Sequence, residues 1–158
     1  MSPADTHRLK LAAQVEADLR AALDLAGTLA RLHSQPDFAA AVDTHAAIAY
    51  RGSQFYSACE SALVRLLTAI DQDVLDAGAW HARVLADAAL EVPGLRPAWI
   101  GADTQALLDD LRRFRHFLRH AYAVALDPRR LASRCADVAA VAPLVERDLR
   151  AALAWLRA

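Results

Sequence analysis

The chain has few of the residues that interrupt helices or build sheets. Its 158 residues include five glycines and six prolines, and runs of β-branched residues alternating with polar ones are missing. This scarcity favours long helices over sheet. Aromatic residues make up only 6% of the chain although hydrophobic residues make up 56%, so alanine and leucine supply most of the apolar surface.

Long apolar runs and a large net charge are also missing. No stretch approaches the roughly 20 apolar residues of a membrane span, and the N-terminal residues lack the basic segment and apolar core of a signal peptide. We therefore expect a cytoplasmic protein with no membrane partner. The formal net charge of −1 argues against a generic polyanion binder. The length suits one domain over residues 1–158.

Cysteine and tryptophan are too sparse to suggest chemistry of their own. Cys59 and Cys135 lie far apart, in no spacing that resembles a metal site, and we expect both to be reduced core residues. Trp80, Trp99 and Trp155 are expected to be packing residues rather than platforms for stacked bases.

Apolar residues that recur every three or four positions predict five helices. These cover about residues 5–32, 37–71, 80–90, 103–126 and 129–155, with an irregular loop at about 92–101. Pro143 is expected to kink the last helix. The pattern is typical of an all-α bundle of four to five helices.

The predicted helix at about 103–126 contains a dense basic cluster. It holds Arg112, Arg113, Arg115 and Arg119, with His116 and His120 among them. One apolar stripe on this helix should enter the core, and a smaller strip with Phe117 and Val124 lies apart from it. A helix with two apolar sides is expected to contact a second surface, and a homodimer would provide one.

Arg115, His120 and Tyr122 combine a phosphate binder, an acid–base group and a modifiable hydroxyl. Arg115 and Tyr122 are seven positions apart and stack on the helix surface, whereas Arg115 and His120 diverge by about 140°. One chain alone would therefore make a poor active site. Two copies of the helix that meet across a groove would pool the side chains into a composite site.

The pattern Arg115-x4-His120-x-Tyr122 resembles the signature of HEPN-superfamily ribonucleases, in particular the HepT-like toxins of type VII-like MNT/HepT toxin–antitoxin modules. Three stretches carry the likeness: Tyr50-Arg-Gly-Ser-Gln-Phe-Tyr-Ser-Ala-Cys-Glu60, the Pro93-Gly-Leu-Arg-Pro97 loop, and Leu111 to Tyr122 with Asp127 behind it. The resemblance covers about residues 40–130. It departs from the family's pattern at His116, where a small polar residue is usual.

The resemblance implies a HEPN-like up-and-down bundle that acts as a metal-independent ribonuclease without a cofactor. Arg115 and His120 would be catalytic, beside the basic residues Arg112, His116 and Arg119, whose charge separately predicts contact with the RNA backbone. It also implies a homodimer and a nucleotidyltransferase antitoxin of the MNT type, which would add AMP to Tyr122. RNA carries its own 2′-OH nucleophile, so the protein needs only a base, an acid and a cation.

Other interpretations of the same residues remain open. The basic cluster is also compatible with a solvated helix face balanced by Asp109 and Asp110, and His116, His120 and Asp109 together could chelate a metal. Glu60 could line the same cleft, although a salt bridge between helices is the favoured interpretation. The alternative function is a non-catalytic HEPN helper that binds a nucleotide or docks a nucleotidyltransferase.

Overall fold

The chain is all-α in this computed structural model, which describes residues 2–72, 80–120 and 125–158. The helices are α1 (Pro3–His33), α2 (Val42–Leu66), α3 (Trp80–Ala88), α4 (Ala102–His120) and α5 (Pro128–Arg157), and a π-helical turn η1 (Leu67–Asp71) extends α2. Extended pairing in the described ranges is limited to one bridge, between Val92 and Arg96. The predicted fold class is confirmed.

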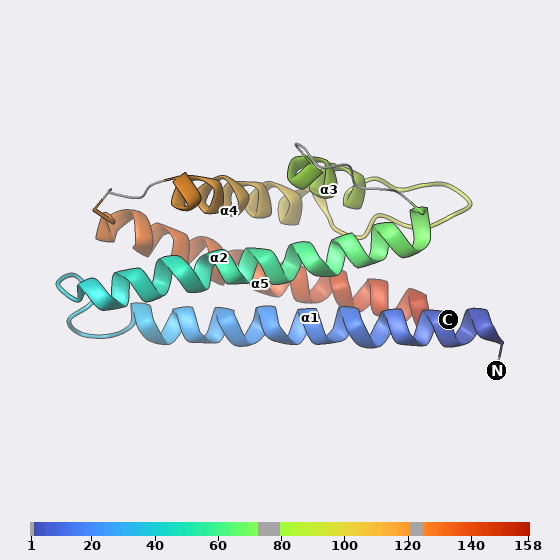
Figure 1. Cartoon of the computed structure of the whole chain (residues 1–158), viewed down its shortest axis with the longest axis horizontal. Helices are drawn as coiled ribbons and strands as arrows, with labels where there is room; N and C mark the ends of the chain where they lie inside the picture. The colour runs from blue at the N-terminus through green and yellow to red at the C-terminus, as the bar shows by residue number, and fades with distance from the viewer. Residues whose placement is uncertain (1, 73–79, 121–124) are drawn as a thin grey trace.

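Four long helices run up and down, and the short α3 lies in the connection between α2 and α4 (Figure 1). α1 packs against α2 and α5, whereas α4 packs against the other side of the same two helices. The two ends of the chain lie at the same end of the bundle (Figure 1), where the Arg8 guanidinium donates to the Trp155 carbonyl at 2.9 Å. None of the helices in the described ranges has the length and apolarity needed to cross a membrane.

Two helix starts differ from the prediction, one because of a local cap and the other because of preceding turns. Ser2 caps α1: the Ser2 hydroxyl accepts from the Asp5 amide at 3.1 Å, and the Asp5 carboxylate accepts from the Ser2 amide at 2.8 Å. This capping box, with Pro3 in the first turn, starts the helix earlier. α2 begins only at Val42, because the residues after Asp37 form hydrogen-bonded turns.

The end of α4, the helix that carries the Arg115–His120 pattern, also differs from the prediction. The sequence predicts helix up to about Leu126, but residues 125–127 are not helical. Asp127 instead caps α5, since its carboxylate accepts from the Arg129 amide at 2.9 Å. α5 then continues without interruption through Pro143 to Arg157.

The main core lies between α1, α2 and α5 and is built from alanine, leucine and valine. Cys59 and Cys135 are both free and buried in it, as predicted. Burial raises the pKa of the Cys135 thiol to about 11. Trp99 is buried and meets the Trp155 ring edge to face at 5.4 Å, which confirms these two as packing residues.

A buried arginine anchors the loop that leads from α3 to α4. Arg96 forms a two-pronged ion pair with Asp71 of η1, with Nε–Oδ1 and Nη2–Oδ2 both at 2.6 Å. Its guanidinium also lies 5.3 Å from the Trp99 ring centroid and donates to the carbonyls of Asp87, Leu90 and Pro97. One side chain thus ties η1, α3 and the loop together, and it fixes α3 beside α2.

Candidate functional site: a basic hollow around a buried glutamate

Glu60 of α2 lies at the centre of the contact between α2, α3 and α4. Its side chain is only 7% exposed. Oε1 accepts a hydrogen bond from the Tyr56 hydroxyl at 2.9 Å and another from Nδ1 of His81 at 2.6 Å. Oε2 accepts from Nη1 of Arg115 at 2.9 Å. A carboxylate buried among helices is tolerated because these three donors satisfy it.

The sequence explains part of this cluster. Tyr56 and Glu60 are four positions apart, so they share one face of α2 and bond to each other. Arg115 approaches from the inward edge of α4, and its guanidinium lies 5.3 Å from the Tyr56 ring centroid. Burial, helped by the negative charge of Glu60, holds the pKa of the Tyr56 hydroxyl well above its ordinary value. Tyr56 therefore stays protonated and donates.

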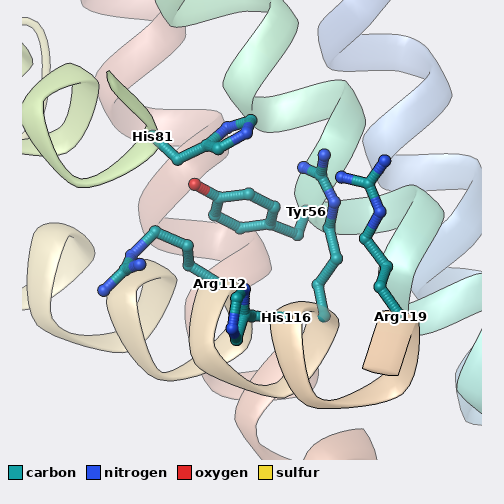
Figure 2. Close-up of a pocket in the computed structure, with 6 residues that line it drawn as sticks. Tyr56, His81, Arg112, His116 and Arg119 are labelled. Carbon is teal, nitrogen blue, oxygen red and sulfur yellow. The ribbon is translucent and has the colours of Figure 1, made fainter. Parts of the chain in front are cut away.

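Beside this cluster lies a small open hollow of about 50 Å³, lined by Tyr56, His81, Arg112, Arg115, His116 and Arg119. Figure 2 shows His81 reaching from α3 across the Tyr56 hydroxyl, while His116 and Arg119 rise from α4. Three of the six lining residues are arginines, which makes the hollow suited to an anion.

The three arginines are not equally engaged. Arg112 donates from Nε to Asp109 at 2.7 Å, and Arg115 is bonded to Glu60. Arg119 makes no hydrogen bond or ion pair with any residue that the structure describes. A guanidinium has five N–H donors, so Arg115 keeps donors for a ligand even while it binds Glu60.

The hollow brings together some of the predicted site residues and leaves others apart. Arg115, Arg112, His116 and Arg119 line it, whereas His120 is exposed at the last turn of α4 and is not among the lining residues. Tyr122 lies outside the described residues. Arg115 and His120 therefore point to different surroundings within one chain.

His120 is oriented by its own helix. Its Nδ1 lies 2.8 Å from the carbonyl oxygen of His116. A carbonyl can only accept, so Nδ1 carries the hydrogen and Nε2 keeps its lone pair in the neutral ring. The metal alternative would need Asp109 as a third ligand, but that carboxylate pairs with Arg112 and Arg113, each at 2.7 Å.

Two lining residues, Tyr56 and His81, were absent from the predicted site. Glu60 in an otherwise apolar stretch of α2 was a usable signal, because a buried carboxylate needs donors. The interpretation of Glu60 as a salt bridge between helices is confirmed by its bond to Arg115. No signal pointed to His81, since its place depends on how the Arg96 anchor seats α3.

One of three comparisons with known proteins identifies the family of the chain. The sequence model of the HepT-like protein family matches residues 47–156, which includes most of α2 and all of α3 and α4, and nearly all of α5. The match therefore extends beyond the predicted limit of the resemblance near residue 130. Neither the curated proteins nor the solved structures give a match. With its helical bundle and most of its length covered, the chain belongs to the HepT-like family of the HEPN superfamily.

Proposed function

We propose that this HepT-like protein is the toxin of a toxin–antitoxin pair and acts as a ribonuclease that needs no metal. Family membership supports the toxin–antitoxin role. The observation that supports the chemistry best is the hollow lined by Arg112, Arg115 and Arg119, on the same helix as the exposed His120. Such a surface suits a phosphodiester backbone in a protein whose net charge is only −1.

The proposed reaction uses the nucleophile that RNA carries. The 2′-OH attacks the adjacent phosphorus and loses its proton, the bond to the 5′-oxygen breaks, and that oxygen gains a proton. The products are a 2′,3′-cyclic phosphate and a 5′-hydroxyl. Arg115 would hold the phosphate oxygens, and His120, with Nε2 open, would transfer one of the two protons.

A homodimer would bring these groups together. Arg115 faces the hollow of its own chain while His120 is exposed outside it. The His120 of a second copy, placed over the hollow, would complete the site. The half-exposed ring of Phe117, at the groove between α4 and α5, offers an apolar surface for such pairing.

The proposed partner is an antitoxin of the nucleotidyltransferase (MNT) type. Addition of AMP to Tyr122 would attach a bulky anion two residues after His120 in the sequence. Intact-mass measurement of the protein co-expressed with the neighbouring nucleotidyltransferase tests this: a gain of one or more AMP groups that Tyr122→Phe abolishes supports it.

The ribonuclease itself is tested with purified protein and a mixture of labelled RNAs in the presence of EDTA. Wild type should cleave, and His120→Ala should lower the rate at least ~100-fold, since a lost acid–base group costs about that much. His7→Ala, a change of an exposed histidine on α1, is the matched control and should cleave like wild type. Full activity in His120→Ala would overturn the catalytic assignment. An inactive wild type that still binds the nucleotidyltransferase would favour the non-catalytic helper.

A further inference from the structure

We infer that His81 of α3 is the general base of this site, with Glu60 as the residue that positions it. This inference rests on the ribonuclease function proposed above. It adds a side chain from outside the Arg115–His120 pattern and assigns His120 the complementary role of acid.

The orientation of His81 suits it to act as a base. Its Nδ1 lies 2.6 Å from Oε1 of Glu60. A carboxylate can only accept, so Nδ1 holds the hydrogen, and Nε2 of the neutral ring has the free lone pair that a base needs. The ring also lies against Trp80, with 3.8 Å between centroids. Two contacts therefore hold the imidazole, while its side chain remains 31% exposed.

Glu60 also holds the base, His81, and the cation, Arg115, at a fixed spacing. Glu60 holds His81 through Oε1 and Arg115 through Oε2. Because one carboxylate joins both, the base and the phosphate-binding cation are kept at a fixed spacing beside the same hollow. Glu60 is itself immobilised by burial and by the Tyr56 hydroxyl. An aspartate or glutamate that orients a histidine in this way is a recurrent device in hydrolytic sites.

The surroundings of Nε2 of His81 suit an RNA backbone. The hollow that His81 faces also contains His116, Arg112 and Arg119. If the arginines hold the phosphodiester, the 2′-OH of the adjoining ribose can approach the Nε2 lone pair of His81. No described residue already occupies that lone pair. His120, by contrast, lies outside the hollow of its own chain.

The proton transfers balance in this scheme. Nε2 of His81 takes the 2′-OH proton as the bond between the 2′-oxygen and phosphorus forms. The bond between phosphorus and the 5′-oxygen then breaks, and the protonated His120 of a second copy gives its Nε2 proton to that oxygen. His81 ends protonated and His120 neutral, and exchange with water restores both.

The matched variants exploit the two ring nitrogens. In His81→Asn the amide N–H replaces Nδ1–H, so the bond to Glu60 is kept, while Nε2 and the ring contact with Trp80 are lost. A role limited to joining α3 to α2 would leave the cleavage rate of this variant unchanged. A role as base predicts a loss of at least ~100-fold in kcat with a thermal midpoint close to wild type.

A modified RNA substrate then distinguishes the base from the acid. After the wild-type cleavage site in a short RNA is mapped, sulfur replaces the bridging 5′-oxygen at that site, so that departure needs no proton. Cleavage by His120→Ala should recover on this RNA, whereas cleavage by His81→Asn should stay at least ~100-fold below wild type. His7→Asn is the control for handling and should match wild type on both RNAs.

Each outcome decides something. Cleavage by His81→Asn at the wild-type rate, or its recovery on the sulfur-containing RNA, overturns the assignment of His81 as base. If His81→Asn melts early, His81→Ala with added free imidazole takes its place: restored cleavage supports the base, and no gain contradicts it. A wild type that cleaves no RNA overturns the proposed function and this inference together, whereas an active wild type with an active His81→Asn overturns the inference alone.

Discussion

The two sides of α2 make different kinds of contact. Towards α1 and α5 the contacts are almost entirely apolar, and α5 alone buries ten residues, among them Leu149 and Val145. Towards α3 and α4 the contact is organised by charged groups, and α4 buries only three residues. Apolar packing is non-directional and supplies stability. The hydrogen-bonded carboxylate of Glu60 contributes less net stability, but it fixes the direction of every group that binds it. The proposed site lies on the second side.

The largest expected effect comes from the apolar side. Leu19→Ala on α1 removes a side chain that is 3% exposed and should lower the free energy of unfolding by about 3 kcal/mol, through lost burial and a cavity. Leu9→Ala on the same helix, where the side chain is 48% exposed, is the control and should change it by less than about 0.5 kcal/mol. Urea unfolding measures both, and equal effects would show that α1 does not anchor the core.

The next effect tests the polar side. Arg115→Ala leaves the buried Glu60 carboxylate with Tyr56 and His81 alone, and should cost about 2 kcal/mol because a buried charge loses its ion-pair partner. Arg113→Ala, which removes a guanidinium that is 69% exposed, should cost under about 0.5 kcal/mol.

Restoring the balance of charge sharpens that test. The double variant Glu60→Gln/Arg115→Ala should be more stable than Arg115→Ala, since no unpaired carboxylate remains. A double variant less stable than both single variants would contradict the role of Glu60 as a paired buried charge. Because Arg115→Ala is expected to be less stable, its ribonuclease activity should be compared with that of wild type at a temperature at which both are folded.

Alkaline pH tests the burial of the Cys135 thiol, which unfolding exposes to water. Burial raises the pKa of Cys135 from 9.0 to about 11, so above pH 9 the unfolded chain loses a proton that the native chain keeps. Stability is then lost as the pH rises from about 9 to 11. The difference between the two pKa values sets an upper limit of about 2.7 kcal/mol, and solvent screening reduces the expected loss to roughly 1 kcal/mol. Urea midpoints between pH 8 and 10.5 measure this, with Cys135→Ala as the control that should show a smaller decline. An equal decline in both would contradict the assignment.

The smallest effect concerns α2 itself, which both sides share. Gly52 is buried within the helix, yet a Cβ added there would meet no atom within 4 Å. Gly52→Ala should therefore stabilise the protein by about 0.5–1 kcal/mol through better helix propensity. Gly27→Ala on α1, where a Cβ would meet only the end of Arg31 at 3.6 Å, is the matched change and should behave similarly. Destabilisation at Gly52 alone would indicate that another surface closes on that face.

Much of the fold was readable from residue patterns because helix periodicity is local. The five helical segments, the loop before α4 and the buried cysteines were predicted, and the errors lie at helix ends such as Ser2 and Val42, where one cap or turn decides. The divergence of Arg115 from His120 followed from helix geometry alone. The site was less predictable. Tyr56 bonds to Glu60 four positions away on the same helix, whereas His81 entered the site through a contact that no short pattern encodes.

By itself, the sequence determined an all-α chain with a basic helix and the Arg115–His120 pattern, since these depend on residue type and on spacing within one helix. Only the tertiary structure decided what that helix meets. Arg96 pairs with Asp71, 25 residues away, and thereby seats α3. Glu60 is reached by His81 from 21 and by Arg115 from 55 residues away. Such pairings depend on the packing of whole helices, so the sequence could mark Glu60 as a carboxylate in need of donors but could not say which residues supply them.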